Sequence, residues 1–325
     1  MVAMYARPSA PLPTAPAPAP VPAPAPAPVP DPAWLDRAAY PFARHEIELP
    51  AGRVHYLDEG TGPAILFVHG TPSWSFEFRH LVRALSAVHR CIAPDLLGFG
   101  LSERPARFAY TPEAHAEVLA AFVERLGLRD LTLVVHDYGG PIALPLALAQ
   151  RSVVRRVVIL NSWMWPLDDD AFVRRGGRIA GSWLGKLLDR ELALPLRAMM
   201  PAAYGDRSRL TPEIHAQYLA PFATRASRSQ VLWPLARALL DSRPHYAALE
   251  ARAHVLADLP VAIVWGTKDP VLAASHLEHW RRLLPRARVT ELATAGHWPH
   301  EESPDTVIQA IRSLLRDGAV RPRAR

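Results

Sequence analysis

The chain has 325 residues, half of them hydrophobic, which predicts one large domain or a domain with an insertion. Its formal net charge is +6, from 37 basic and 31 acidic residues that are interspersed, and no nucleic-acid-binding motif is present. The single cysteine, Cys91, excludes an intramolecular disulfide and favours a reducing, cytoplasmic compartment. No apolar run approaches the roughly 18 residues of a membrane span, so neither a nucleic acid nor a membrane is expected as a partner.

Residues 1–33 are dominated by a Pro/Ala repeat from Pro8 to Pro32. Closely spaced prolines disfavour helices and sheet ladders, so this segment is expected to be an extended, disordered tail without a role in the chemistry. A flexible basic tail is expected at the other end, over residues 319–325.

Short apolar strands alternate with helices between Trp34 and about residue 162. This alternation predicts a mostly parallel sheet covered by helices on both faces, hence an α/β fold. The carboxyl ends of parallel strands meet at one edge, where active sites of open α/β sheets collect. The expected strands are His45–Leu49, Arg53–Leu57, Ala64–Val68, Arg90–Ala93, Leu131–Val135 and Val153–Leu160, and the expected helices are Phe76–Leu85, Thr111–Leu126 and one that runs to Gln150.

The pattern changes from about Trp165 to Ala253, where only helical stretches are found. Strands resume at Val261–Trp265 and Val289–Leu292, with helices at His276–Leu284 and Asp305–Leu315. A helical insertion at this point predicts a lid that closes a pocket and excludes water. The expected organisation is therefore a core over 34–162, a helical cap over 163–255 and the second part of the core over 256–318.

Asp137 lies where an apolar strand ends and two glycines and a helix follow, in the stretch 131–142. This order of strand, sharp turn and helix is typical of a nucleophile elbow, which exposes one reactive side chain at the sheet edge. An aspartate that caps a helix would give the same pattern. Residues elsewhere in the sequence are therefore needed to distinguish a nucleophile from a helix cap.

Asp269 and His297 each follow a later strand, and so they are expected at the same edge as Asp137. The order nucleophile, acid, histidine is that of the α/β-hydrolase fold. Three such residues in this order favour a catalytic triad over isolated structural residues.

The motifs His69-Gly70-Thr71-Pro72, His136-Asp137-Tyr138-Gly139-Gly140-Pro141, Gly266-Thr267-Lys268-Asp269-Pro270 and Gly296-His297 together resemble the α/β-hydrolase superfamily. The aspartate at the elbow, with the stretch Thr71-Pro72-Ser73-Trp74-Ser75-Phe76, is most similar to haloalkane dehalogenases. The resemblance covers about residues 40–315. It implies hydrolysis of small haloalkanes to alcohol and halide, with an apolar small molecule and water as the reactants. No metal or organic cofactor is expected, and the enzyme is expected to be a monomer or a homodimer.

The resemblance also implies a role for each site residue. Asp137 displaces halide and forms an alkyl ester, His297 activates the water that hydrolyses the ester, and Asp269 orients the imidazole. The backbone amides of Thr71 and Tyr138 stabilise the oxyanion. Oxyanion- or halide-binding is assigned to Thr71, Tyr138 and Trp74.

The leaving-group site departs from the family pattern. Haloalkane dehalogenases usually carry a tryptophan after the nucleophile and an asparagine, glutamate or lid tryptophan as a second donor, whereas this chain has Tyr138 and Thr71 there. Trp163, Trp165 and Trp183 could donate to a halide, although packing is the default interpretation of each.

Three other functions fit parts of the pattern. An epoxide hydrolase would use the same triad with a pair of lid tyrosines, for which Tyr204, Tyr218 and Tyr246 are available. A haloacetate dehalogenase would carry arginines beside the nucleophile, where this chain has Tyr138 and Gly139. A catalytically silent binding protein would be expected to lack a triad residue.

Overall fold

The computed structural model describes residues 31–149 and 152–317. The expected Pro/Ala tail over 1–33 falls outside these residues except for its last three, and the expected basic tail over 319–325 falls outside them entirely. Within the described residues, no helix combines the length and apolar character that are needed to cross a bilayer.

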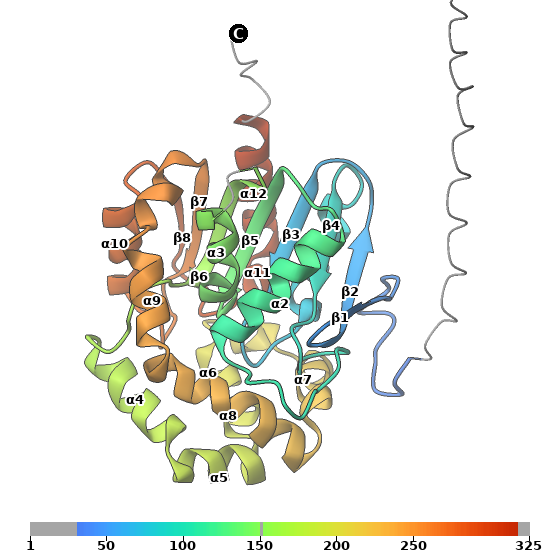
Figure 1. The fold of residues 1–325 in the computed structure, drawn as a ribbon, viewed down its shortest axis with the longest axis vertical. Coiled ribbons are helices and arrows are strands. Elements are labelled where there is room, and N and C mark those ends of the chain that lie inside the picture. The colour runs from blue at the N-terminus through green and yellow to red at the C-terminus, as the bar shows by residue number, and fades with distance from the viewer. Residues whose placement is uncertain (1–30, 150–151, 318–325) are drawn as a thin grey trace, which may run out of the picture. The chain divides into compact units, whose positions relative to one another are not determined.

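An eight-stranded sheet forms the core, with strand order β1-β2-β4-β3-β5-β6-β7-β8 (Figure 1). The first two pairings in this order are antiparallel, and all the others are parallel. Every residue of β5 is buried, as expected for a strand with helices on both faces. The strands are β1 His45–Leu49, β2 Gly52–Glu59, β3 Ala64–Val68, β4 Arg90–Pro94, β5 Leu131–Asp137, β6 Val154–Ser162, β7 Val261–Gly266 and β8 Arg288–Leu292.

Helices cover both faces of this sheet. Helix α3 packs on β5, β6 and α2, whereas α12 packs on β7 and α1 on the opposite face (Figure 1). Helix α2 begins where the sequence predicts, because the Thr111 side chain accepts a hydrogen bond from the Ala114 amide, and Gly127 adopts a left-handed φ of 62° after its end. The helices of the core are η1 Ser75–Phe78, α1 Arg79–Leu85, α2 Pro112–Arg125, α3 Gly139–Ala149, α10 Ala274–Leu283, α11 Pro299–Glu302 and α12 Pro304–Asp317.

The segment between β6 and β7, described throughout, contains helices and no strand. Helices α4 and α5 pack against α8 and lie farthest from the sheet, at the lower end of Figure 1. We call this segment the cap. Its helices are α4 Ala171–Gly181, α5 Trp183–Leu192, the π-helical turn η2 Pro195–Met199, α6 Met200–Ala203, η3 Arg207–Arg209, α7 Pro212–Leu219, η4 Ala220–Phe222, α8 Arg225–Asp241, α9 Arg243–Glu250 and η5 Ala253–Asp258.

The structure confirms the expected α/β class with a mostly parallel sheet, and it corrects some element bounds. The expected helix over 76–85 starts as the 3₁₀ helix η1 and becomes α-helical only at Arg79. Strand β2 extends to Glu59 because its last four residues pair with β4, which single-strand periodicity cannot reveal.

Candidate active site

Asp137 occupies a sharp turn between β5 and α3. Its φ is +48°, in the left-handed region that non-glycine residues rarely adopt, as a nucleophile elbow requires. The glycines that follow are needed because the chain is tightly packed there. A Cβ on Gly139 would lie 2.1 Å from the Val68 carbonyl oxygen, and one on Gly140 would lie 2.0 Å from Ser162 Oγ. Close packing against β3 at Gly139 and against β6 at Gly140 therefore leaves no room for a side chain at either position.

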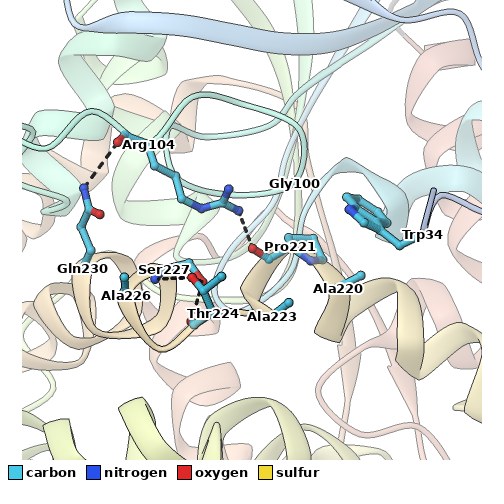
Figure 2. Close-up of a pocket in the computed structure, with 10 residues that line it drawn as sticks. All are labelled: Trp34, Gly100, Arg104, Ala220, Pro221, Ala223, Thr224, Ala226, Ser227 and Gln230. Atoms are coloured by element: carbon cyan, nitrogen blue, oxygen red, sulfur yellow. Dashed lines mark hydrogen bonds between the residues drawn. The ribbon is translucent and has the colours of Figure 1, made fainter. Parts of the chain in front are cut away.

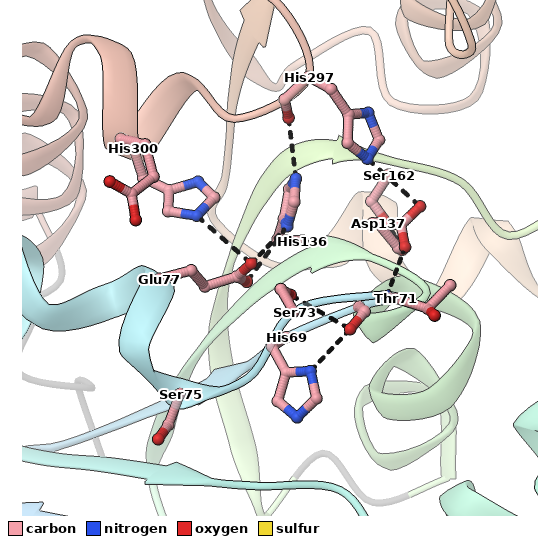
Figure 3. Close-up of polar contacts among 12 residues, drawn as sticks. His69, Thr71, Ser73, Ser75, Glu77, His136, Asp137, Ser162, His297 and His300 are labelled. Carbon is pink, nitrogen blue, oxygen red and sulfur yellow. Dashed lines mark hydrogen bonds and ion pairs between the residues drawn. The ribbon is translucent and has the colours of Figure 1, made fainter. Parts of the chain in front are cut away.

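Each carboxylate oxygen of Asp137 has a separate neighbour. Oδ2 accepts a 2.8 Å hydrogen bond from the Thr71 amide, and Oδ1 lies 3.5 Å from His297 Nε2 (Figure 3). The approach of the loop after β3 depends on Gly70, where a Cβ would lie 2.3 Å from Asp137 Oδ2. The Thr71 amide is therefore aimed at the carboxylate in advance of any substrate.

His69 holds this loop in place through both ring nitrogens. Nε2 accepts a 2.9 Å hydrogen bond from the Leu96 amide, so Nδ1 carries the proton that it donates to the Gly70 carbonyl at 2.7 Å. Burial lowers the pKa of His69 despite nearby acidic groups, which keeps the ring neutral and suits this donor and acceptor pattern.

His297 and Asp269 follow β8 and β7 and meet beside the elbow. His297 Nδ1 lies 2.6 Å from Asp269 Oδ2, and both side chains are buried. The other oxygen of Asp269 accepts hydrogen bonds from the amides of Val271 and Leu272. The structure thus brings together the three residues that the sequence singled out, in the order Asp137, His297, Asp269 across the site.

The charges of the three side chains are coupled. Burial alone would lower the pKa of His297, but the carboxylates of Asp269 and Asp137 raise it to about 10. Burial alone would raise the pKa of Asp269, but His297 and the hydrogen bonds that the carboxylate accepts hold it below its usual value. The two neighbouring acidic side chains therefore favour the protonated form of His297 in the resting site.

Asn161 supports the acid, a role that the sequence analysis did not assign. Its Nδ2 donates to Asp269 Oδ2 at 2.9 Å and to the Gly266 carbonyl at 3.1 Å, and its Oδ1 accepts from the Gly266 amide at 2.8 Å. Its φ of +31° is unusual for a residue at the end of a strand. The position of a polar residue at the end of β6 was the signal available in the sequence.

A second buried layer lies behind the triad, around His136 (Figure 3). His136 Nε2 donates to the His297 carbonyl at 2.8 Å, and its Nδ1 lies 3.1 Å from Glu77 Oε1. His300 packs edge-on against the His136 ring, with 4.6 Å between the ring centroids, and its Nε2 lies 3.7 Å from Glu77 Oε2. The donor atoms of these three residues are close enough to suit a metal ion, but His136 already uses both ring nitrogens to hold His297 and Glu77. We interpret the layer as support for the catalytic loop.

The expected leaving-group donors Tyr138 and Trp74 are engaged elsewhere. The Tyr138 hydroxyl donates to the Leu235 carbonyl at 2.7 Å, and the Trp74 indole donates to the Gln217 carbonyl at 3.0 Å. Both acceptors belong to the cap. A role for either side chain in holding a halide would require it to exchange these partners.

Trp163 has an available donor. Its indole is buried, packs edge-on against Tyr138 with ring centroids 4.8 Å apart, and its Nε1 has no hydrogen-bond partner among the described residues. Trp165 instead stacks on His279, and Trp183 is 75% exposed on the outside of the cap. Of the three tryptophans considered from the sequence, Trp163 is the one placed beside the elbow.

Two of the three cap tyrosines are also engaged. Tyr218 donates to Glu301, and Tyr246 donates to the Ala238 carbonyl at 2.9 Å. Tyr204 stacks on Trp298, and its hydroxyl has no partner within the described part of the chain. The structure therefore does not present a pair of free tyrosine hydroxyls from this set.

A separate cavity of about 310 Å³ lies between the loop after β4 and the start of α8 (Figure 2). Arg104 crosses it and donates to the Pro221 carbonyl at 2.6 Å, while Thr224 caps α8. None of the triad residues lines this cavity, so it is distinct from the site at the elbow.

Comparison with known proteins agrees with this geometry. Residues 63–304 match the family described as alpha/beta hydrolase fold. The chain is 35% identical to haloalkane dehalogenase 2 of Mycobacterium tuberculosis (strain ATCC 25618 / H37Rv), over 85% of this chain and 96% of that protein. It is 33% identical to a cis-3-alkyl-4-alkyloxetan-2-one decarboxylase of Shewanella oneidensis, over 85% of this chain and 89% of that protein.

A solved structure with a similar fold is the haloalkane dehalogenase DbeA from Bradyrhizobium elkani USDA94. It superposes with a TM-score of 0.76 at 25% identity, over 86% of this chain and 100% of that chain. The family match covers most of the core and all of the cap. The chain belongs to the α/β-hydrolase fold family and is a haloalkane dehalogenase-like enzyme.

Proposed function

We propose that this enzyme hydrolyses small haloalkanes to an alcohol and a halide through an ester on Asp137. One observation carries the proposal. Asp137 stands on a strained elbow with one carboxylate oxygen held by the Thr71 amide and the other facing His297 Nε2 at 3.5 Å. A carboxylate in the place of a serine is suited to attack at a saturated carbon, because its ester with an alkyl group is stable until water is activated.

In the first step, an Asp137 oxygen attacks the carbon that carries the halogen, a C–O bond forms, and the C–X bond breaks to release halide. This step needs no proton transfer, so it is compatible with the protonated state of His297 in the resting site. Trp163 is our candidate donor to the departing halide, because its buried Nε1–H lies beside the elbow without a partner among the described residues.

In the second step, His297 must be neutral to accept a proton from water. Ester formation itself favours this, because it removes the negative charge of Asp137 that helps to hold the proton on His297. The activated water attacks the ester carbonyl, and the amides of Thr71 and Tyr138 stabilise the oxyanion. When the tetrahedral intermediate collapses, the bond between the carboxyl carbon and the alkoxide oxygen breaks, the alkoxide takes the proton from His297 and leaves as the alcohol, and Asp137 is regenerated.

The proposal is tested with intact-protein mass spectrometry of His297→Ala incubated with a dibromoalkane. We expect a mass increase that matches one bromoalkyl group on Asp137, because attack on carbon does not need the base whereas hydrolysis does. Asp137→Asn is the control and should gain no mass. A folded His297→Ala variant that gains no mass with dibromoalkanes would contradict the proposal.

A second candidate is the opening of a dialkyl oxetan-2-one. It is favoured by the relative that is 33% identical. It is also favoured because the side chains of Tyr138 and Trp74, which were expected to bind a leaving halide, already donate hydrogen bonds to the cap. Attack of Asp137 on the saturated ring carbon that is bonded to the ring oxygen would break that C–O bond. The freed carboxylate would stay attached to the rest of the substrate. Loss of CO₂ would then expel Asp137 and leave an alkene, without hydrolysis. Formation of an alkene from such a lactone by the unmodified enzyme distinguishes this reaction from dehalogenation.

Epoxide hydrolysis is less favoured. It needs two hydroxyl groups to protonate the epoxide oxygen, and the hydroxyls of Tyr218 and Tyr246 already donate to other groups. An aromatic epoxide is therefore the second probe for His297→Ala, after the dibromoalkane. An adduct formed only with the epoxide would reverse this ranking and make Tyr204 the next residue to replace.

A further inference from the structure

The outer surface of the cap exposes an unusual concentration of large apolar side chains. Nine such side chains are exposed in the described part of the chain, and eight of them lie between residues 172 and 199. The most exposed are Trp183 at 75% and Phe172 at 66%. Monomeric proteins rarely gather so many apolar side chains on one surface without a partner. We call the exposed large apolar side chains of α4 and α5 the cap patch: Phe172, Ile179, Trp183, Leu184, Leu187 and Leu192.

The two helices present their larger apolar residues outward. In α4, the buried positions are Val173 and Gly177, one turn apart, and a Cβ on Gly177 would lie 3.1 Å from Leu240 in α8. In α5, the buried positions are Gly185 and Asp189. Burial of a carboxyl group raises the pKa of Asp189 to about 7. An ordinary surface helix would bury its Trp and Leu side chains instead.

Basic residues accompany the patch. Arg175, Arg178 and Arg197 are exposed, and none of them makes an ion pair or side-chain hydrogen bond in the described residues. The acidic residues of the same helices do not balance this charge, because Asp189 is buried and Glu191 is paired with Arg225 at 2.7 Å. The patch is therefore apolar with a positive border.

We propose that the cap patch binds the surface of an anionic lipid bilayer. Aromatic and aliphatic side chains with a border of arginines match the chemistry of that interface, where the apolar groups enter the acyl boundary and the arginines meet lipid phosphates. A second copy of the chain fits less well, because a two-fold contact would place the same unpaired arginines opposite one another. This proposal concerns binding at the membrane surface and goes beyond our expectation of no membrane partner, which rested on the lack of a spanning run; it does not depend on the reaction at Asp137.

Flotation of the full-length protein with lipid vesicles tests the proposal. We expect the protein to float with vesicles of equimolar phosphatidylcholine and phosphatidylglycerol, and not with phosphatidylcholine alone. Added salt should weaken binding. The double variant Trp183→Ser/Leu187→Ser should lower the partition coefficient about tenfold or more, and Arg175→Glu/Arg178→Glu should act in the same direction.

The chain offers matched controls for both variants. Val88 is 63% exposed and lies outside the cap, so Val88→Ser should not alter flotation. Arg107 is likewise exposed and remote in sequence from α4 and α5, so Arg107→Glu should be neutral. Turnover of a water-soluble substrate without vesicles should be the same in all four variants, which keeps membrane binding separate from catalysis.

Two results would overturn the proposal. The first is flotation that is absent with the anionic vesicles or that both cap variants leave unchanged. The second is a dimer in sedimentation velocity that Trp183→Ser/Leu187→Ser dissociates, in a protein that binds no vesicles, because a second copy would then cover the patch.

Discussion

Asn161 Nδ2 donates a 2.9 Å hydrogen bond to Asp269 Oδ2, the same oxygen that lies 2.6 Å from His297 Nδ1. The amide of Asn161 and the carboxylate of Asp269 are thus buried, hydrogen-bonded neighbours near the ends of β6 and β7. The amide can stabilise the charge of Asp269 but cannot replace it, since only a carboxylate can balance an imidazolium.

This contact predicts that the carboxylate that supports His297 can be transferred from residue 269 to residue 161. Asp269→Asn should lower kcat by about 100-fold or more because His297 loses its charged partner. Adding Asn161→Asp should recover about tenfold of that loss, since the pair again holds one carboxylate and one amide. Steady-state kinetics of the single and double variants measure this. A double variant no more active than Asp269→Asn would show that the carboxylate must stand at residue 269.

The packing of glycines near the elbow predicts a separation of activity from stability. A Cβ on Gly70 would lie 2.3 Å from Asp137 Oδ2 and 2.5 Å from Asp137 Cβ, both side-chain atoms of the nucleophile. Gly70→Ala should therefore displace Asp137 and lower kcat about 100-fold, with a smaller loss of stability than Gly139→Ala. A Cβ on Gly139 would meet the Val68 carbonyl at 2.1 Å, so Gly139→Ala should lower the free energy of unfolding by about 2 kcal/mol or more.

Gly176→Ala is the control for both, because no atom lies within 4 Å of its Cβ position. It should leave activity unchanged and should not lower stability. Equal loss of stability in Gly70→Ala and Gly139→Ala would contradict the distinction between a side-chain and a backbone obstacle.

Trp163→Phe tests the leaving-group donor. If the indole N–H holds the halide, the variant should lose about tenfold in kcat/KM and should bind halide ions more weakly, as measured by product inhibition. Trp265→Phe is a matched control, since its indole is also buried without a partner among the described residues but lies within β7. Similar kinetics for the two variants would argue against the assignment.

The pKa of His297 predicts a pH dependence of stability. The folded pKa of about 10 exceeds the value of about 6.5 expected for an unfolded histidine, so the native state binds the proton more tightly. The stabilisation is present below about pH 6.5 and is lost as the pH rises towards 10, by at most about 1.4 kcal/mol per pH unit.

Urea unfolding between about pH 7 and about pH 9.5 measures this effect. The free energy of unfolding should fall with rising pH in the unmodified enzyme and change less in His297→Gln. The exposed His254 provides the control, because His254→Gln should retain the full dependence. A dependence that is the same in all three proteins would contradict a high pKa for His297.

Sequence patterns predicted the strands, the order of the three candidate catalytic residues and the position of the helical insertion, because these depend on local periodicity and on where parallel strands end. They did not predict the partners of Tyr138 and Trp74, whose donors bind the carbonyls of Leu235 and Gln217 about a hundred or more residues away. Such contacts depend on how the cap packs on the core, which a local pattern does not contain. The roles of Asn161 and Glu77 were missed because they depend on contacts between distant parts of the core, of Asn161 with Asp269 and of Glu77 with His136.

The backbone of His297 is tied to two different layers. Its amide donates to the Ala203 carbonyl in α6 at 2.8 Å, and its carbonyl accepts from His136 in β5. A cap that lifted away at α6 would break the first of these bonds and release the general base from its fixed orientation. The cap can therefore admit substrate while His297 keeps its orientation only if α6 stays bound to the core. The opening motion would then be confined to the distant helices α4 and α5.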